Sequence, residues 1–332
     1  FNYHQFQPLF YQVATAGLDA SNISFPLRKV FQKSSNVRLR MADVLSVETS
    51  SQKVITSAGD FDYDVLVIAT GAGTNFFGNT AMEANAFPMK STVEALQLRH
   101  RLLHNFEDAI DVKDELLLQR LMTIVVVGGG PTGVELSGAI ADMRRDVLPK
   151  DYPEIDFSKM KIYLLEGTDR TLAAMSGKSS EDSKRYLEKL GVIVETNSLL
   201  KEYDGKTAIL QDGRKIETSL VIWAAGIKGN VPAGIDKELL ARGNRIKVDR
   251  KCRVLGFGNV FAIGDVAYME EPAWPGGHPQ VAPVAIQQAD MLVTNLKVLQ
   301  MKSSASNMLD FEYNDKGSMA TIGKHKAVVD LN

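Results

Sequence analysis

Three glycines in one short stretch are spaced to bind phosphate. Gly128, Gly130 and Gly133 follow the β-branched run TIVVV (Thr123–Val127) in the pattern G-x-G-x-x-G. Gly128 permits a tight turn, Gly130 lets a pyrophosphate approach the backbone, and Gly133 lets the next helix pack closely on the strand. The start of that helix offers free N–H groups and the positive end of its dipole. We therefore expect these glycines, with Thr132 beside them, to bind the pyrophosphate of a dinucleotide.

An acidic residue after the next predicted strand indicates which dinucleotide binds. Lys161–Leu165 (KIYLL) is the predicted strand, and Glu166 follows it. A carboxylate there can accept hydrogen bonds from the adenosine ribose and would repel the extra phosphate of NADP, so we expect NAD(H). Glu166 lies further along than the usual roughly 20 residues, and the insertion VLPKDYPEIDFSK accounts for the difference. A solvated strand end is the alternative role for this residue.

The surrounding segments predict an α/β fold with a doubly wound, mostly parallel sheet, because strands and helices alternate along the chain. After the glycines, four apolar residues recur at the helical period and predict one buried helix face: Leu136, Ile140, Met143 and Val147. The other expected elements are helices over Ser180–Leu190 and Pro283–Gln300, strands over Val65–Ala69, Val192–Glu195 and Asn259–Ile263, and hairpin strands over Arg38–Glu48, Lys53–Ile55, Leu199–Tyr203 and Thr207–Leu210.

Composition excludes several classes of site. The 332 residues include 38 Lys and Arg against 40 Asp and Glu, so charge gives no reason to expect nucleic acid as a partner. The single cysteine, Cys252, rules out an intramolecular disulfide, a CxxC redox pair and a thiolate zinc cluster. His100 and His104 lie in the polar stretch RHRLLHNFED without the H-E-x-x-H pattern, so we expect a solvated helix face and no metal site. No apolar run reaches the roughly 18–20 residues of a membrane-spanning helix.

Three predicted strand ends together resemble the two-dinucleotide-binding flavoproteins of the pyridine nucleotide-disulfide oxidoreductase superfamily. One strand ends in ATG (Ala69–Gly71), another ends in AIGD (Ala262–Asp265), and WAAGI (Trp223–Ile227) is similar to the family's turn on the NAD side. The resemblance implies two Rossmann-like domains, for FAD and NAD, with β-hairpin crossovers and the beginning of a C-terminal domain.

The same resemblance implies cofactor contacts residue by residue. The side chain of Asp265 is expected to bind the ribityl and pyrophosphate region of FAD, and the ATG strand end to close over the flavin. The implied contacts are Val44, Ala69, Thr70, Gly71, Asp265 and Ala282 for FAD, and Gly226 for NAD in addition to the glycine-rich turn.

Four further stretches look like type II NADH:quinone oxidoreductases. They are the opening NYHQFQPLFYQVATAGL, GGGPTGVE with Glu135 just after the last glycine, VAPVAIQQAD (Val281–Asp290) and DKGSMATIGKHKAVVDL (Asp315–Leu331). The resemblance implies that NADH reduces FAD, and that FAD reduces a membrane quinone, menaquinone or ubiquinone, without proton pumping. It also implies a peripheral enzyme on the cytoplasmic face of the inner membrane, and it allows a homodimer.

Departures from the family pattern shape the expected domains. The family's first FAD-binding module would precede Phe1 and its membrane-anchoring helices would follow Asn332, so we expect a fragment of a longer protein. The quinone motif A-Q-x-A-x-Q has Pro283 in place of its first Gln and keeps Gln287. The expected domains are 1–90 with 236–305 for FAD, 91–235 for NAD(H), and 306–332 as the start of a C-terminal domain, with an exposed linker at Lys302–Asn307.

The expected mechanism has no sulfur relay. Cys252 follows IKVDR late in the chain and is expected to be a small buried residue, so electrons must leave the flavin directly. A hydride passes from NADH to flavin N5, and two electrons then pass to the quinone. The positive end of the helix near Pro283 would stabilise reduced flavin by roughly 0.3–2 kcal/mol. The runners-up are an NADH:ferredoxin or rubredoxin reductase and a redox-dependent protein like the apoptosis-inducing factors.

Several candidate residues keep two interpretations. Glu135 either complements the helix dipole or positions the nicotinamide and relays protons. Gln287 either hydrogen-bonds a quinone carbonyl or is a polar residue on the helix surface. Phe6, Phe10 and Tyr11 either line a quinone tunnel or pack in the core.

Overall fold

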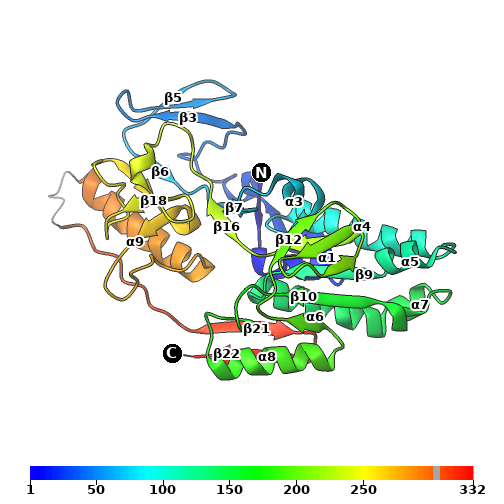
Figure 1. Ribbon diagram of the computed structural model, residues 1–332. Coiled ribbons are helices and arrows are strands. Elements are labelled where there is room, and N and C mark those ends of the chain that lie inside the picture. The colour runs from blue at the N-terminus through cyan, green and yellow to red at the C-terminus, as the bar shows by residue number, and fades with distance from the viewer. Residues whose placement is uncertain (302–306, 332) are drawn as a thin grey trace. The chain divides into compact units, whose positions relative to one another are not determined.

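The computed structural model describes residues 1–301 and 307–331. The described residues form two compact units, whose elements are labelled in Figure 1. Unit 1 comprises Phe1–Val37, Thr74–Gly226 and the segment that begins at Lys316, and unit 2 comprises Arg38–Gly73 and Ile227–Asp315. Apart from Asn307, the expected linker Lys302–Asn307 lies outside the described residues.

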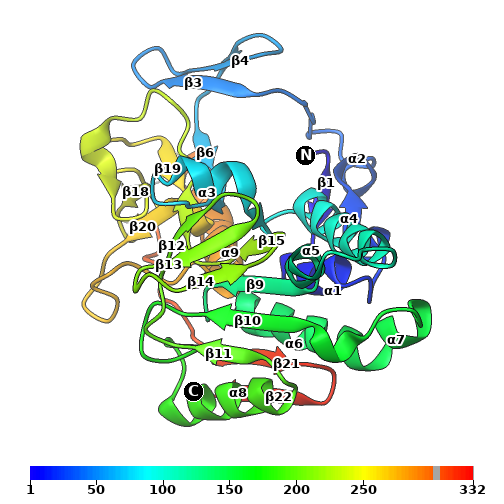
Figure 2. The same ribbon diagram turned by 45° about the vertical axis from the view of Figure 1, so that its right-hand side comes forward.

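A five-stranded parallel sheet forms the centre of unit 1 (Figure 2), in the order β11-β10-β9-β15-β8. All five residues of β9 are buried, because its Val and Ile side chains pack on both faces of the sheet. The prediction of a mostly parallel α/β sheet is confirmed, and β9 and β10 have the predicted bounds. The five strands are β8 (Phe87–Pro88), β9 (Thr123–Val127), β10 (Lys161–Leu165), β11 (Ile193–Glu195) and β15 (Leu220–Trp223).

Helices pack against this sheet through an extensive apolar core. The helices of unit 1 are α1 (Phe10–Ala14), α2 (Leu27–Val30), α3 (Thr80–Asn85), α4 (Thr92–Ala109), α5 (Glu115–Leu121), α6 (Pro131–Asp146), α7 (Leu148–Asp151) and α8 (Gly177–Lys189), with 3-10 turns η1 (Gln7–Leu9), η2 (Ala20–Asn22) and η3 (Phe157–Lys159). The polar helix begins earlier than predicted because the side chain of Ser176 caps it, accepting a hydrogen bond from the Ser179 N–H at 3.2 Å.

The face of α6 is buried as predicted except at its end. Leu136, Ile140 and Met143 are buried in the core. The prediction for Val147 is wrong, because this side chain is 45% exposed. The helix ends at Asp146, and Val147 is its C-cap, where the backbone leaves the helical path before α7 begins.

Smaller antiparallel sheets complete unit 1. They are β1 (Tyr3–Gln5) with β2 (Ser24–Pro26), the three strands β12 (Leu200–Tyr203), β13 (Thr207–Leu210) and β14 (Lys215–Glu217), and the hairpin of β21 (Ser318–Ile322) with β22 (Lys326–Asp330). The predicted hairpin around Asp204 and Gly205 is confirmed. The β21–β22 hairpin packs on α6 and α8, as Figure 2 shows.

Unit 2 contains a parallel pair, β6 (Leu66–Ile68) with β19 (Val260–Ala262). Its other strands are β3 (Val44–Glu48), β4 (Lys53–Thr56), β5 (Phe61–Asp62), β7 (Ala72–Thr74, which runs to the boundary with unit 1), β16 (Ile227–Gly229), β17 (Leu240–Ala241), β18 (Arg245–Val248) and β20 (Ala267–Met269), with 3-10 turns η4 (Lys237–Leu239) and η5 (Gly264–Val266). The strand predicted over Arg38–Glu48 is too long. Its ladder with β4 begins only at Val44, which pairs with Thr56.

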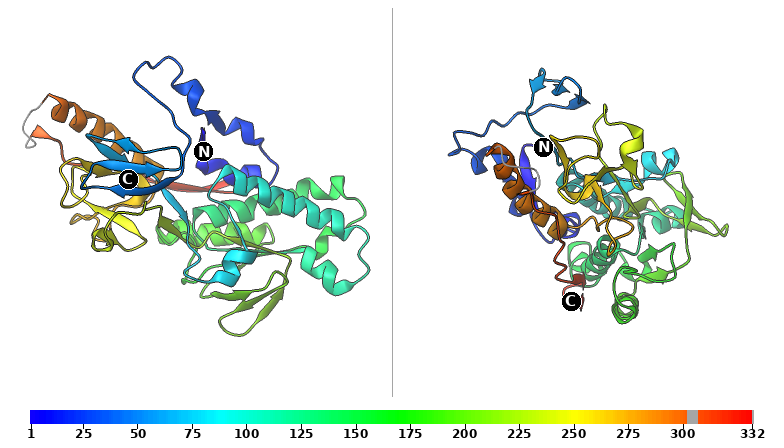
Figure 3. Two further views of the ribbon diagram at one scale, coloured as in Figure 1. Left: turned by 90° about the horizontal axis from the view of Figure 1, so that it is seen from above. Right: turned by 90° about the vertical axis from the view of Figure 1, so that its left-hand side faces the viewer.

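The long helix α9 (Ala282–Gln300) packs on the strands of unit 2 (Figure 3). Val284 belongs to one apolar cluster with Val260, and Leu292 belongs to another with Phe261, so this face of α9 covers β19. Pro283 lies in the first turn, as predicted, where a missing N–H costs nothing.

The compact units do not follow the predicted domain boundaries. Phe10 of α1 shares an apolar cluster with Leu98 of α4, so the N-terminal segment packs in unit 1. Ala320 and Ile322 of β21 join the same cluster, so this hairpin packs in unit 1. Which nucleotide each unit binds remains a prediction.

Candidate active site

The glycine-rich turn has the geometry that its spacing predicts. Gly128 has a φ of +110°, and a Cβ there would lie 2.6 Å from the carbonyl oxygen of Ala224. A Cβ at Gly133 would overlap the carbonyl oxygen of Gly128, so α6 can approach β9 only with glycine at this position. A Cβ at Gly130 would meet no atom within 4 Å. The turn is therefore closed where it packs and open where a phosphate would approach.

Glu166 lies against the same turn. Its Oε2 accepts a hydrogen bond from the Gly129 N–H at 2.6 Å. Its Oε1 accepts hydrogen bonds from the Thr168 N–H at 2.7 Å and from the Thr168 hydroxyl at 2.8 Å. The carboxylate thus ties the end of β10 to the glycine-rich turn, a role that the sequence did not reveal, and its contact with ribose stays a prediction.

The turn after β15 lies at the same edge of the sheet. Trp223 pairs in register with Val127, and the Ala224 N–H donates to the carbonyl of Val127 at 2.8 Å. Gly226 follows, and its carbonyl accepts a hydrogen bond from the Asn75 N–H at 3.0 Å. The structure therefore brings Gly226 to the edge that carries the glycine-rich turn.

Glu135 and Thr132, both in the first turns of α6, line a small cavity. Its volume is about 80 Å³, and its wall consists of Gln7, Pro8, Phe10, Tyr11, Met89, Lys90, Thr132 and Glu135. Burial raises the pKa of the Glu135 carboxyl to about 7, although hydrogen bonds from Thr321 oppose the rise. A carboxyl with this pKa is partly protonated at neutral pH and can give or take a proton.

The three aromatic candidates near the N-terminus lie in different surroundings. Phe10 is only 3% exposed and packs in the core, where it also contributes to the cavity wall. Tyr11 lines the cavity as well. Phe6 is 50% exposed and is not part of the wall.

In unit 2, the structure brings the two predicted flavin strand ends together. Ile68 pairs with Ala262 in the parallel ladder, and the Ile263 N–H donates to the carbonyl of Ile68 at 3.1 Å. Ala69–Gly71 and Gly264–Asp265 therefore leave the sheet at the same edge. Open α/β sheets bind ligands at such an edge, beyond the carboxyl ends of their strands.

A loop residue fixes the ATG strand end. The Thr70 hydroxyl donates to the carbonyl of Asn230 at 2.5 Å, and the Asn230 N–H donates to the carbonyl of Gly71 at 3.0 Å. Gly71 has a φ of +67°, and a Cβ there would meet no atom within 4 Å. The strand end is thus held in place while its outer side stays open.

The start of α9 contacts the Gly264–Asp265 turn. The side-chain carbonyl of Gln288 accepts a hydrogen bond from the Gly264 N–H at 2.7 Å, and Gln288 is only 2% exposed. Gln280 donates to the Asp265 carbonyl at 2.8 Å. Sequence reasoning missed Gln288; the signal was its place four residues from both Val284 and Leu292, on the buried face. Ala282 begins the helix, as expected.

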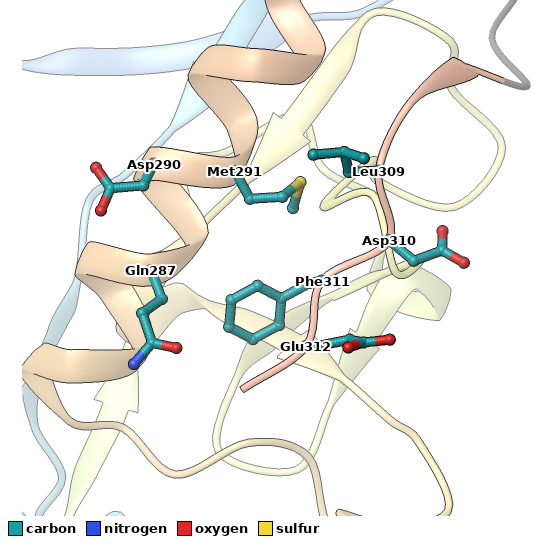
Figure 4. A pocket seen from close by; sticks show the side chains of 7 residues that line it. All are labelled: Gln287, Asp290, Met291, Leu309, Asp310, Phe311 and Glu312. Carbon is teal, nitrogen blue, oxygen red and sulfur yellow. The ribbon is translucent and has the colours of Figure 1, made fainter. Parts of the chain in front are cut away.

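Both polar atoms of the Gln287 side chain hydrogen-bond the backbone of Asn314. Its Nε2 donates to the carbonyl of Asn314 at 3.0 Å, and its Oε1 accepts from the Asn314 N–H at 2.9 Å. It lies on the wall of an open cavity of about 520 Å³ (Figure 4), with Asp290, Met291, Leu309, Asp310, Phe311 and Glu312. A quinone contact would therefore use the second N–H of Nε2 or the second lone pair of Oε1.

Val44, the remaining residue with an expected FAD contact, begins β3 and is 46% exposed. Cys252 is fully buried, and burial raises the pKa of its thiol to about 12, so it is protonated and unreactive at neutral pH. The rings of His100 and His104 stack, with their centroids 5.9 Å apart. In the described ranges, no group of three or more His, Cys, Asp or Glu is arranged to bind a metal ion, and no helix is both long and apolar enough to span a bilayer.

Known proteins are similar to this chain in sequence and in fold. Residues 2–289 match the pyridine nucleotide-disulphide oxidoreductase family. The type II NADH:quinone oxidoreductase Ndh of Mycobacterium tuberculosis is 35% identical over 345 residues, covering 99% of this chain and 72% of that protein. The type II NADH:quinone oxidoreductase of Staphylococcus aureus is 27% identical, covering 98% of this chain and 80% of that protein.

Solved structures agree on the fold. NDH2 from Plasmodium falciparum in complex with NADH superposes with a TM-score of 0.88 at 22% identity, over 100% of this chain and 84% of that one. A ferredoxin reductase from Rhodopseudomonas palustris superposes with a TM-score of 0.72 at 19% identity, over 95% and 70%. Because sequence identity to the mycobacterial enzyme extends over nearly the whole chain, the protein belongs to the type II NADH:quinone oxidoreductases, within the pyridine nucleotide-disulphide oxidoreductase family.

Proposed function

We propose that the chain oxidises NADH and reduces a quinone, with FAD as the cofactor between them. The observation that carries the proposal is the 35% identity, over 99% of the chain, to an enzyme named for this reaction. The protein supplies binding, orientation and proton transfer, and FAD supplies the ability to accept a hydride and to release two electrons.

The glycine-rich turn would bind the pyrophosphate of NADH. The open side of Gly130 leaves room for phosphate oxygens close to the backbone, and the first N–H groups of α6 point to the same place. Glu166 would accept hydrogen bonds from the adenosine ribose. The additional phosphate of NADPH would lie next to this carboxylate, so we expect a preference for NADH.

The edge formed by β6 and β19 fits the binding of a flavin nucleotide. Gly71 and Thr70 lie on one strand end, and Asp265 follows the other. The N-terminus of α9, with Ala282 in its first turn, contacts the Gly264–Asp265 turn and would favour negative charge on the bound group. The family resemblance alone supports a contact between the exposed Val44 and FAD.

Glu135 is our candidate for the acid–base group. Quinone reduction consumes two protons, and a carboxyl whose pKa is about 7 can exchange protons at neutral pH. Its place beside Thr132, two residues beyond Gly130, puts it next to the predicted NADH site. For Gln287 we propose a supporting role, in which it fixes the segment at Asn314 and so shapes the wall of the large cavity in Figure 4.

We also propose that the enzyme works at a membrane surface, on its cytoplasmic face, because long-chain quinones are dissolved in the bilayer. Co-sedimentation of the full-length protein with lipid vesicles tests the membrane contact, and analytical ultracentrifugation tests whether it forms a homodimer. Recovery of all protein in the supernatant would contradict peripheral attachment.

Steady-state kinetics with alternative acceptors tests the proposed function. The purified, flavin-loaded protein is mixed with NADH and either a short-chain menaquinone or ubiquinone analogue, or an oxidised ferredoxin or rubredoxin. We expect rapid NADH oxidation with a quinone, and the faster analogue identifies the quinone class. Turnover with the iron–sulfur protein alone would replace the proposal with a reductase of that type.

A further inference from the structure

One face of α6 carries three residues that receive the β21–β22 hairpin. Glu135, Gly138 and Asp142 follow the spacing i, i+3, i+7, so they share this face. A Cβ at Gly138 would lie 2.5 Å from the backbone nitrogen of Gly323 in the hairpin turn. The Asp142 carboxylate accepts a hydrogen bond from the Lys324 N–H at 2.6 Å. The hairpin turn therefore sits directly on α6, one and two helical turns beyond Glu135.

The far end of the hairpin is fastened to α8. The carboxylate of Asp330 accepts hydrogen bonds from the Ser176 N–H at 2.6 Å and from the Ser176 hydroxyl at 2.8 Å. It also accepts one from the Ser179 hydroxyl at 2.7 Å. The turn and the end of β22 are thus tied to helices of unit 1, and because β21 pairs with β22 along its whole length, the position of β21 is fixed as well.

Strand β21 places Thr321 against Glu135. The Thr321 N–H donates to Glu135 Oε1 at 3.3 Å, and the Thr321 hydroxyl acts to lower the pKa of the carboxyl. Tyr11 Oη lies 3.0 Å from Thr321 Oγ1, and Gln12 Nε2 donates to Tyr11 Oη at 3.0 Å. The amide nitrogen of Gln12 can only donate, so Tyr11 Oη accepts that hydrogen bond. The Tyr11 hydroxyl can then donate its own proton to Thr321 Oγ1, and the Thr321 hydroxyl can donate to Glu135.

We propose that Thr321 and Tyr11 are positioning residues that hold the Glu135 carboxyl at the cavity wall and set its affinity for a proton. The hydroxyls form a chain that points its protons toward Glu135, and such a chain favours the ionised carboxyl. The inference rests on the proposed function of Glu135 as the acid–base group, and it assigns a part of this site to the hairpin near the C-terminal end.

Other titratable groups on the same cavity wall must be held constant in any test. These are Tyr11 itself and Lys90, whose Nζ donates to Gln7 Oε1 at 3.4 Å. Lys90 stays unchanged in every variant below, so its field affects all of them equally. Burial of Glu135 also stays the same in the isosteric variants.

Infrared titration of the Glu135 carboxyl, in flavin-loaded protein without substrate, tests the inference. The band is assigned by its loss in Glu135→Gln. Thr321→Val, which removes the hydroxyl but keeps the N–H, is expected to raise the midpoint by about one pH unit, a tenfold change in the ionisation constant. Thr321→Ser retains the hydroxyl and is expected to titrate like the wild type. Tyr11→Phe is expected to shift the midpoint upward by less.

The outcomes separate this inference from the proposed function. An unchanged midpoint in both Thr321→Val and Tyr11→Phe overturns the positioning role, as does a Thr321→Ser variant that titrates like Thr321→Val. If Thr321→Val does not fold, Tyr11→Phe decides alone. A shifted midpoint that leaves the pH profile of quinone reduction unchanged supports the positioning role and removes Glu135 from the chemistry.

Discussion

The two units form their predicted nucleotide-binding edges in different ways. In unit 1, one continuous segment supplies strand β9, the glycine-rich turn and helix α6. In unit 2, the corresponding parts come from three distant segments: Ala69–Gly71 after β6, Gly264–Asp265 after β19, and the start of α9. The first edge depends on backbone geometry at glycines. The second depends on hydrogen bonds that join the segments, above all those of Gln288 and Asn230.

This difference predicts where each edge is vulnerable. A continuous motif fails when a side chain enters space that the backbone occupies. An assembled edge fails when a connecting side chain is removed, because the segments then lose their register. The changes below test this contrast, from the largest expected effect to the smallest.

Gly133→Ala is expected to have the largest effect. Its Cβ would overlap the carbonyl oxygen of Gly128, so the variant should lose about 3 kcal/mol or more of unfolding free energy and lose NADH binding. Gly130→Ala is the matched control, because its Cβ meets open space. It should keep the melting temperature yet weaken NADH binding at least about tenfold by blocking the phosphate approach. Unchanged NADH affinity in Gly130→Ala, measured by calorimetry, would contradict the site.

Glu135→Gln should lower quinone-reducing turnover by roughly 100-fold, the usual size of an acid–base contribution. The change keeps the shape of the side chain, so folding should be preserved. Stopped-flow measurement of flavin reoxidation isolates this step from NADH binding. Wild-type rates in this variant would remove the acid–base role.

The same residue predicts a pH dependence of stability. Its pKa rises from 4.5 to about 7 on folding, so the folded state keeps a proton that the unfolded state has lost. Stability is therefore fully present below pH 4.5 and falls by up to about 3 kcal/mol as the pH rises through 7. Glu135→Gln should lack this loss and be relatively more stable at pH 8. Parallel melting curves of the two proteins across this range would contradict the raised pKa.

Gln288→Leu tests the assembled edge. It leaves the partly buried Gly264 N–H without its acceptor, which costs about 1–3 kcal/mol. We expect lower FAD retention with NADH binding intact, read from the flavin-to-protein absorbance ratio and from calorimetry. Gln287→Leu is the neighbouring control and should cost less, because its partner, the Asn314 backbone, is exposed and can bind water. Equal loss of FAD in both variants would mean that the effect comes from α9 as a whole.

Glu166→Gln is expected to have the smallest effect on the fold and a selective one on the coenzyme. The amide oxygen can still accept a hydrogen bond from the Gly129 N–H, so the turn should stay in place, but the amide NH2 then replaces the oxygen that accepts from Thr168. The preference for NADH over NADPH, as the ratio of kcat/KM values, should fall by about tenfold, because the repulsion of the extra phosphate is gone. An unchanged ratio would assign the discrimination to another residue.

The edge of unit 1 could be predicted almost completely from the sequence. Strand β9, the glycines and helix α6 are adjacent in the chain, and the residue pattern of each one indicates its own conformation. The strand ends of unit 2 were found through family resemblance, but Gln288 was not, because a buried glutamine on α9 is recognisable only with its partner Gly264 in view. Thr321 and Tyr11 were missed as partners of Glu135 for the same reason. Tyr11 and Thr321 hydrogen-bond each other across 310 positions of the chain, and only the structure shows this contact. Val147 failed because periodicity predicts a face but not the residue at which a helix ends.

Anaerobic single-turnover spectroscopy tests the central claim most directly. The flavin-loaded protein is titrated with NADH and then mixed with a short-chain quinone. We predict that one equivalent of NADH bleaches the flavin absorbance and that the quinone restores it. A thiol reagent added to the native protein after NADH and before quinone should detect no newly formed thiol. A flavin that NADH does not bleach, or a bleached flavin that quinone leaves unchanged, would contradict the account.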